Sequence, residues 1–351
     1  MDYLTQLDQY AKEGRLTADL TKMMRGFYKT YAEAAVANGA QLSSINLLMK
    51  RFLEYVIHEL IEPSAFEPFH QCVRSPEDFY LFGLDFIRPL VILQDSKILH
   101  SKNLDKIEAQ ISHGDNVILL ANHQTELDPQ AISLLLEKEH PRLAEEMIFV
   151  AGHRVISDPM AIPFSKGRNL LCIYSKKYIE DNPALKQERL QHNQRTMNRM
   201  SQLLSEGSKC IYVAPSGGRD RPNRVGKLEV AEFDGQSIEL FWLMAQKSGH
   251  PTHFYPLALS TYDLLPPPDN VKKKLGEPRH TKATPIHLAF GAEVDMDHFS
   301  GSDHLDKKQK RQARARYIWE QVCRDYDELD MKKNSTQRRS VTERRQRKEE
   351  S

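Results

Sequence analysis

The chain has 351 residues, with 49 Lys or Arg and 48 Asp or Glu, so its formal net charge is +1. This length is enough for one large domain or two with a sizeable core. A net charge close to zero gives no whole-protein field that favours nucleic acid or an anionic membrane. The mean hydropathy is −0.57, and no apolar run reaches the roughly 18 residues of a membrane span, so we expect no transmembrane segment.

Residues 1–72 have only helical periodicity, and we expect them to form a small N-terminal helical bundle. Apolar residues recur at helical spacing in two stretches, with the dipeptide Asn38-Gly39 as a stop signal between them. The first stripe is Leu20, Met23, Met24, Phe27, Tyr28 and Tyr31, and the second is Leu47, Leu48, Phe52, Tyr55, Val56 and Leu60. Such stripes are typical of a bundle core. The segment 64–75 has no period and is the expected domain boundary.

From residue 76 to residue 330 the sequence pattern changes to short apolar runs that alternate with helical stretches. This pattern predicts a larger α/β domain with a mixed, largely parallel sheet covered by helices. The expected strands are Asn116–Leu120, Met147–Ala151, Leu170–Tyr174, Lys209–Ala214, His253–Leu259 and Pro285–Phe290. The main expected helices are Pro129–Lys138, Leu185–Leu204 and Gln236–Lys247.

Residues 331–351 contain almost no apolar side chains and an excess of Lys and Arg. A segment of this composition buries too little surface to order itself, so we expect a disordered basic tail. Contact with RNA, an acidic protein or lipid head groups is the alternative to a purely solvated tail.

The four cysteines are widely spaced and form no CxxC pair. Cys172 and Cys210 lie within apolar runs, where a free cysteine behaves as a small hydrophobic residue. The N-terminus lacks the pattern of a secretion signal or a transit peptide. We therefore expect a reduced, intracellular protein without a zinc site.

The segment 121–129 reads ANHQTELDP and follows an expected buried strand. In this setting Asp128 can hold one ring nitrogen of His123, which leaves the other nitrogen to take a proton from a hydroxyl. The alternative is that Asp128 is an ordinary helix N-cap before Pro129. The spacing alone does not decide between the two.

Basic residues follow two further expected strands. Lys177 lies in the segment GRNLLCIYSKKY at 167–178, and Arg219 and Arg221 lie in PSGGRDRP at 215–222. Ligands of open α/β sheets bind at the carboxyl ends of the strands, so these cations and His123 are expected around one crevice. Two guanidinium groups and an ammonium suit a phosphate dianion, while each residue taken singly is equally an ordinary surface charge.

These three segments resemble the conserved blocks of soluble, plastid-type sn-glycerol-3-phosphate 1-O-acyltransferases, within the wider His-x4-Asp glycerolipid acyltransferase family. The resemblance spans nearly the whole chain, with the blocks in the same order. PSGGRDRP is specific to the soluble branch, whereas membrane-bound relatives carry a Pro-Glu-Gly type of block. One position departs from the family, because Tyr178 follows Lys177 where the family has Lys-His.

The resemblance implies transfer of a fatty acyl group from acyl carrier protein or acyl-CoA to the sn-1 hydroxyl of glycerol 3-phosphate, for phospholipid synthesis. It implies His123 and Asp128 as catalytic residues, and Lys177, Arg219, Arg221 and Tyr178 as phosphate ligands. Amides of Gly217 or Gly218 are further candidates, for the oxyanion. No metal, organic cofactor or nucleic acid is implied, and membrane contact is at most peripheral. The implied compartment is the bacterial cytosol, or the plastid stroma if a transit peptide has been removed.

Two alternatives stay open at this stage. The acceptor could be lysophosphatidate, with the same His-x4-Asp pair. The protein could also be a non-catalytic module that binds a phosphate ligand or acyl carrier protein. An intact His123 and Asp128 favour an enzyme.

Overall fold

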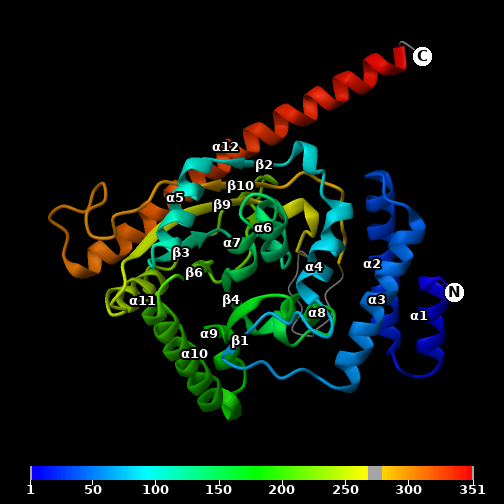
Figure 1. Cartoon of the computed structure of the whole chain (residues 1–351), viewed down its shortest axis with the longest axis horizontal. Helices are drawn as coiled ribbons and strands as arrows, with labels where there is room; N and C mark the ends of the chain where they lie inside the picture. The colour runs from blue at the N-terminus through cyan, green and yellow to red at the C-terminus, as the bar shows by residue number, and fades with distance from the viewer. Residues whose placement is uncertain (1, 268–278, 350–351) are drawn as a thin grey trace.

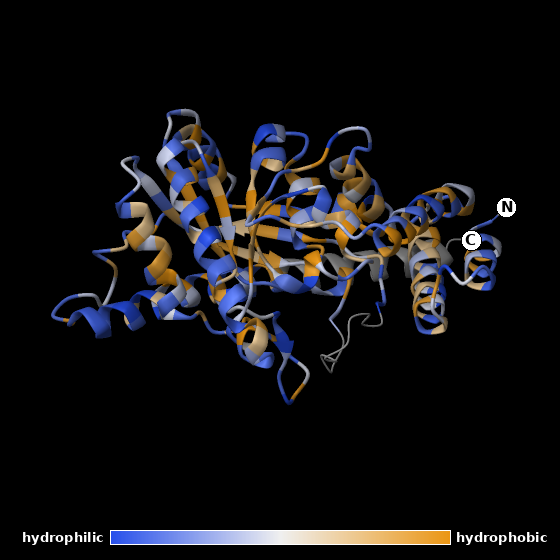
Figure 2. Cartoon of the chain, turned by 90° about the horizontal axis from the view of Figure 1, so that it is seen from below, coloured by the Kyte–Doolittle hydropathy of each residue, from blue (hydrophilic) through white to orange (hydrophobic). Residues whose placement is uncertain are grey.

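The computed structural model describes residues 2–267 and 279–349, and it has the α/β architecture predicted from the sequence. Three N-terminal helices stand beside a body in which helices cover a central sheet (Figure 1). In Figure 2 the apolar colour is concentrated on the strands in the middle of the molecule, as expected for a buried sheet.

The N-terminal helices are α1 (Tyr3–Lys12), α2 (Ala18–Ala37) and α3 (Leu42–Ile61). Asp2 caps α1 by accepting a hydrogen bond from the Thr5 amide. After α2 the chain turns at Gly39, whose φ of +95° is readily available only to glycine. Tyr31 and Phe52, from the two predicted stripes, are buried as expected.

The core of these three helices is continuous with that of the neighbouring body. Phe52 packs on Phe164 of α8 (Ile162–Lys166) with ring centroids 5.6 Å apart. The Tyr31 hydroxyl donates to the Phe86 carbonyl in α4 (Phe79–Ile87) at 2.7 Å. The division into a domain 1–72 and a domain 76–330 stays a prediction, and the apolar core crosses this boundary.

The main sheet has eight strands in the order β1-β5-β4-β6-β3-β9-β10-β2. The pairs β5–β4, β4–β6, β6–β3, β3–β9 and β10–β2 are parallel, while β1–β5 and β9–β10 are antiparallel. The strands are β1 (Phe69–His70), β2 (Lys97–Leu99), β3 (Asn116–Ala121), β4 (Ile148–Gly152), β5 (Asn169–Ile173), β6 (Cys210–Val213), β9 (Thr252–Ser260) and β10 (His287–Phe290). All six predicted strands are confirmed. The sequence analysis missed β1 and β2, which are too short for a periodic pattern.

Helices cover both faces because each strand of the centre is apolar on both sides. In β3, Val117 and Leu119 face α5 (Ser101–Ser112), α6 (Asp128–Leu136) and α7 (Pro141–Glu146). Ile118 and Leu120 face α10 (Lys186–Glu206), α11 (Gly235–Gln246) and α12 (Lys307–Glu349). The remaining elements are α9 (Lys176–Asp181) and a hairpin of β7 (Arg221–Pro222) and β8 (Leu228–Glu229).

Helix α12 differs from the prediction of a disordered tail. Its first half packs on the sheet through buried residues such as Ile318 and Val322. The helix then continues beyond Met331 and projects from the body, ending at Glu349 (Figure 1). The stretch 331–349 lacks Gly and Pro and is rich in residues of high helix propensity, so a helix already nucleated by packing can continue through it.

Among residues 2–267 and 279–349, no helix has the combination of length and apolar sequence that a membrane span requires.

A polar cluster at the amino end of β9 predicts an acid-sensitive contribution to stability. Glu293 accepts hydrogen bonds from Lys106 and from His253, both at 2.6 Å. Burial by itself would raise the pKa of Glu293, but the contacts with Lys106 and His253 outweigh it and lower the pKa to about 2. A carboxylate with a lowered folded pKa stabilises the fold above its unfolded pKa and loses this contribution as the pH falls towards the folded pKa.

We therefore expect Glu293→Gln to lower the free energy of unfolding by about 1–3 kcal/mol at pH 6. The difference from the unmodified protein should shrink as the pH is lowered towards 3. Urea unfolding at several pH values measures this. A difference that stays constant between pH 6 and pH 3 would contradict the assignment.

Candidate active site

The candidate site lies where β3 ends and the chain turns into α6, at the carboxyl ends of the parallel strands. Asn122 fixes this turn by exchanging two hydrogen bonds with the Leu259 backbone of β9, at 2.7 and 3.1 Å. The Tyr212 hydroxyl from β6 donates to the Asn122 carbonyl at 2.9 Å. The turn that carries His123 is therefore held by the strands on both sides of β3.

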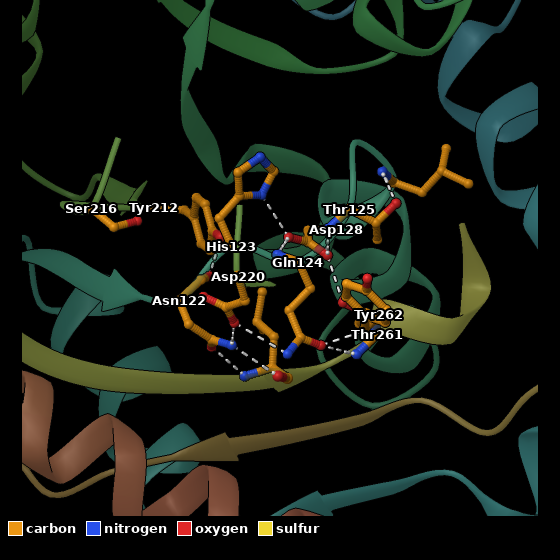
Figure 3. A network of polar contacts seen from close by, with 12 residues as sticks. Asn122, His123, Gln124, Thr125, Asp128, Tyr212, Ser216, Asp220, Thr261 and Tyr262 are labelled. Carbon is orange, nitrogen blue, oxygen red and sulfur yellow. Dashed lines mark hydrogen bonds and ion pairs between the residues drawn. The ribbon is translucent and has the colours of Figure 1, made fainter. Parts of the chain in front are cut away.

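His123 and Asp128 form the pair that the sequence predicts. Nδ1 of His123 lies 2.8 Å from Oδ2 of Asp128, and Figure 3 shows the imidazole reaching over the carboxylate. The Asp128 side chain is 1% exposed and that of His123 is 31% exposed. A carboxylate acceptor at Nδ1 places the proton on that nitrogen, which leaves Nε2 as a base on the accessible side.

Asp128 is saturated with hydrogen-bond donors besides the imidazole. The amides of Gln124 and Thr125 donate to it at 2.8 and 3.2 Å, and the Thr261 hydroxyl donates at 2.6 Å. These donors stabilise the ionised carboxylate in a buried place. They also argue against the alternative that Asp128 is an ordinary helix N-cap. Asp128 is the first residue of α6, and its side chain accepts hydrogen bonds from amides of the preceding loop.

Gln124 ties the same turn to the end of β9. Its side-chain oxygen accepts from the amides of Thr261 and Tyr262 at 2.7 and 2.9 Å. Its amide nitrogen donates to Asp220 at 3.2 Å. The side chains of Asn122 and Gln124, on either side of His123, thus tie the turn to the sheet, and the imidazole of His123 points away from them (Figure 3).

Asp220 anchors the loop that carries the two arginines. Its amide donates to the His123 carbonyl at 2.7 Å, and its buried carboxylate accepts from Asn122 at 2.7 Å and from the Ala231 amide at 3.0 Å. Burial raises the pKa of Asp220 to about 6, although these hydrogen bonds act in the opposite direction. The carboxylate is therefore a costly buried group that is retained to hold the loop against the His123 turn.

Arg219 and Arg221 flank this anchor and are half-buried. Because Asp220 turns inward in an extended segment, its two neighbours project to the other side. The hydrogen bond from Asp220 to His123 brings the arginine loop directly beside the turn that carries His123. The structure thus brings together four of the predicted site residues.

The two glycines of the loop differ in whether the turn already uses their backbone N–H group. Gly217 has a φ of +63°, and its amide donates to the Ala214 carbonyl at 3.1 Å, so this N–H is already engaged in the turn. A Cβ on either Gly217 or Gly218 would meet open space. Of the two predicted oxyanion donors, Gly218 is the one that fits better.

Lys177 and Tyr178 lie in the first turn of α9, directly after β5. The side chain of Lys177 lies outside the part of the chain that the structure describes. The Tyr178 ring stands edge-on to the imidazole of His153, with centroids 5.6 Å apart. This places Tyr178 at the carboxyl edge of the sheet, two strands beyond β6 in the sheet order.

A second buried ion pair braces the turn that carries His123 and Asp128. The guanidinium of Arg279 donates to Glu126 at 3.2 Å and to Asp158 at 3.0 Å. Burial would lower the pKa of Arg279, but the two carboxylates outweigh it and raise the pKa. This contact links the turn after β3, the loop after β4 and the chain that follows residue 278.

Sequence reasoning missed the residues that position the site: Asn122, Gln124, Glu126, Asp220, Thr261 and Arg279. Asn122, Gln124 and Glu126 stand within the quoted motif, and Asp220 alternates with the two arginines, so their spacing was a usable signal. Thr261 and Arg279 lie far away along the chain, and no local pattern marks them.

Outside this crevice, the chain has a hollow of about 600 Å³ on the opposite edge of the sheet, at the amino ends of β4, β5 and β6. Its charged residues are largely paired with one another, as in the contact of Glu206 with Arg199 and Lys209. No group of three or more His, Cys, Asp or Glu arranged to hold a metal ion occurs in the described ranges 2–267 and 279–349.

Taken together, the geometry provides a base, a carboxylate that orients it, and cations on an adjoining loop. Such an arrangement can deprotonate a hydroxyl of a ligand whose anionic group is held by the cations. No side chain of the protein has to act as a nucleophile, since the ligand itself supplies one.

Comparisons with known proteins agree with this chemistry. A family model described as Acyltransferase matches residues 99–260, which contain His123, Asp128 and the arginine loop. The chloroplastic glycerol-3-phosphate acyltransferase of Spinacia oleracea is 36% identical over 334 residues, which cover 93% of this chain and 70% of the relative.

Two further relatives carry the same name. The Arabidopsis thaliana protein is 35% identical over 332 residues, 94% of this chain and 72% of the relative. The Pisum sativum protein is 37% identical over 331 residues, 93% of this chain and 72% of the relative. The chain therefore belongs to the family of chloroplast-type glycerol-3-phosphate acyltransferases.

Proposed function

We propose that the protein transfers a fatty acyl group from a thioester to the sn-1 hydroxyl of glycerol 3-phosphate, giving 1-acyl-sn-glycerol 3-phosphate for phospholipid synthesis. The observation that carries the proposal is the contact between two parts of the crevice. The backbone hydrogen bond from Asp220 to His123 joins the His123–Asp128 pair to the loop with Arg219 and Arg221. A base beside a phosphate-binding loop suits an acceptor that carries both a hydroxyl and a phosphate.

In the proposed reaction Nε2 of His123 takes the proton of the sn-1 hydroxyl while its oxygen attacks the thioester carbonyl carbon. The tetrahedral intermediate then expels the thiolate, which takes the proton back from the imidazolium. Asp128 keeps the imidazole in the required tautomer and stabilises its charged form through the 2.8 Å contact. The carbon–oxygen bond formed and the carbon–sulfur bond broken balance without a covalent enzyme intermediate.

Arg219 and Arg221 are proposed to bind the phosphate, with Lys177 and Tyr178 on its far side. The benefit is geometric, since an acceptor held at its phosphate presents its hydroxyl to His123 instead of meeting the thioester by chance. Tyr178 can donate a hydrogen bond but carries no positive charge. The Gly218 amide is the proposed donor to the oxyanion.

The acyl donor is proposed to be acyl carrier protein or acyl-CoA, and both are anionic. Basic residues near the crevice would steer such a donor electrostatically. The relatives are named as chloroplastic, and we propose the plastid stroma, or the bacterial cytosol, as the compartment, with membrane contact that is at most peripheral.

Thiol release from an acyl carrier protein thioester, measured with and without glycerol 3-phosphate, tests the proposal. We expect release only when glycerol 3-phosphate is present. Stimulation by lysophosphatidate instead would favour that acceptor, and binding of either ligand without thiol release would favour a non-catalytic module. Repeating the assay with acyl-CoA ranks the two donors.

Removing residues 333–351 provides a further prediction. The stretch has an excess of Lys and Arg, and it follows the part of α12 that packs on the sheet, so its loss removes no buried contact of the described core. We expect turnover on acyl-CoA within about twofold of the full chain, because only electrostatic steering is lost.

The comparison uses both donors at low and at high salt. A role in docking acyl carrier protein would appear as a higher KM for that donor, restricted to low salt. A large loss on both donors that salt does not change would show that the segment supports the fold.

A further inference from the structure

His153 stands at the carboxyl end of β4 and has no part in the roles assigned above. It is the first residue after β4 and begins a short 3-10 helix, His153–Ile156. The imidazole is half-buried, and its Nδ1 atom is enclosed without a hydrogen-bond partner among the described residues. Buried polar atoms in proteins are nearly always paired, so a purely structural role for this imidazole carries a cost.

His153 and His123 both follow the carboxyl ends of parallel strands in one part of the sheet. β3 pairs with β6 up to Leu120↔Val213, and His123 follows three residues after Leu120. β4 pairs with β6 at Ile148↔Ile211 and Phe149↔Tyr212, and His153 follows directly after β4 ends.

The strand β6, which leads into the arginine loop, lies between β4 and β3. On its other side β4 pairs with β5 at Gly152↔Ile173, and His153 lies against Tyr174, the next residue after β5. The residue thus lies between the strand that leads into the arginine loop and α9.

Two tyrosines fix the plane of the imidazole. The ring of Tyr174 packs on it with centroids 4.7 Å apart and a tilt of 38°. Tyr178 meets it edge-on, with centroids 5.6 Å apart and an interplanar angle of 84°. These ring contacts orient the imidazole through its faces and edge.

The ionisable groups around His153 are cationic. Burial lowers the pKa of His153, and the charges of Arg189 and His192 on α10 lower it further. Arg189 also donates to the Tyr178 carbonyl. Of the other elements packed on this turn, α8 contributes Lys166, which is engaged with Glu59. Cations that lie close together repel one another and attract an anion.

We propose that His153 is a substrate-contact residue, whose imidazole binds a phosphate oxygen of glycerol 3-phosphate opposite Arg219 and Arg221. The proposal rests on the proposed function. It adds to the phosphate site one residue, which directly follows β4. The bound dianion offsets the repulsion from Arg189 and His192, and it contacts the edge of the ring that carries Nε2, because Nδ1 is enclosed by the protein. Tyr174 and Tyr178 act as positioning residues for the ring.

Two variants separate phosphate binding from packing. His153→Ala removes the whole ring, whereas His153→Phe keeps an aromatic ring against Tyr174 and Tyr178 and removes only the nitrogens. We expect both to raise the KM for glycerol 3-phosphate by about tenfold, the effect of losing one hydrogen bond to a charged group. The kcat and the KM for the acyl thioester should stay within about twofold.

Inorganic phosphate provides a second measurement, as a competitive inhibitor against glycerol 3-phosphate. Its inhibition constant should rise in both variants by the same factor as the KM. His70→Ala is the matched control, because His70 is another half-buried imidazole but pairs with Leu170 near the amino end of β5. That variant should change neither constant.

Three results would overturn the inference while the unmodified enzyme remains active. The first is a His153→Phe enzyme with unchanged constants for glycerol 3-phosphate and phosphate, which would make the ring a packing element. The second is a parallel change of kcat and of both KM values. The third is an equal effect of His70→Ala. If the unmodified protein shows no release that depends on glycerol 3-phosphate, the proposed function itself fails instead.

Discussion

Replacing His123 by alanine is expected to reduce acyl transfer by a factor on the order of 10²–10⁴, because the reaction loses its positioned base. His123 donates its Nδ1 proton to Asp128, and its side chain is 31% exposed and closes no part of the core. The fold should therefore survive the change. Initial rates of thiol release, together with thermal unfolding of the same samples, measure both effects.

Asp128→Asn tests the orienting part of the pair. An amide at this position can donate to Nδ1 and so favour the tautomer that has its proton on Nε2, which cannot act as the base. We expect a large loss of kcat with little change in either KM. The buried carboxylate also accepts from the Thr261 hydroxyl and from two amides, so thermal stability should fall as well.

The matched control for His123 is His58→Ala, which removes an exposed imidazole from α3, distant from the crevice along the chain. It should leave turnover unchanged. A folded His123→Ala protein that retains nearly full turnover would contradict the proposed mechanism, whatever the result for Asp128→Asn.

Alanine at Arg219 or at Arg221 is expected to raise the KM for glycerol 3-phosphate by about ten- to a hundredfold each, since a hydrogen bond to a charged group contributes about 1.5–3 kcal/mol. The KM for the acyl thioester should stay nearly unchanged. The Asp220 anchor between them remains bonded to the His123 turn, so the base keeps its place. Kinetics with both substrates varied provide the measurement.

Two further variants sharpen this result. Lysine at either position keeps the charge but not the planar fork, and it should recover only part of the affinity. Arg224→Ala removes an exposed arginine from the same β7–β8 hairpin and should have no effect. A change in the thioester KM alone would mean that Arg219 and Arg221 bind the donor instead of the phosphate.

The sequence by itself was enough to predict the central strands and the chemistry of the site. Each of the strands β3, β4, β5, β6, β9 and β10 is a continuous apolar run, and such a run marks a strand buried on both faces wherever it occurs. His123 and Asp128 are five residues apart in one turn, so their pairing depends on local geometry that a motif can encode. The order of the motifs also carried the resemblance to the family.

Local patterns misled at two places. The strands β1 and β2 have two and three residues, too few to show a period. Beyond Met331 the sequence has almost no apolar residues, which predicted disorder, while the structure continues α12 to Glu349. A helix makes its hydrogen bonds along the chain and does not require buried side chains to continue once it has begun.

Only the tertiary structure decided what holds the site in place. Thr261 and Arg279 reach Asp128 and Glu126 from more than a hundred residues away, and Asp220 reaches Asn122 from the loop that follows the neighbouring strand β6. These contacts depend on the strand order, which brings the ends of β3, β6 and β9 together. Pairing across a sheet is set by the burial of whole faces, so no window of the sequence contains it.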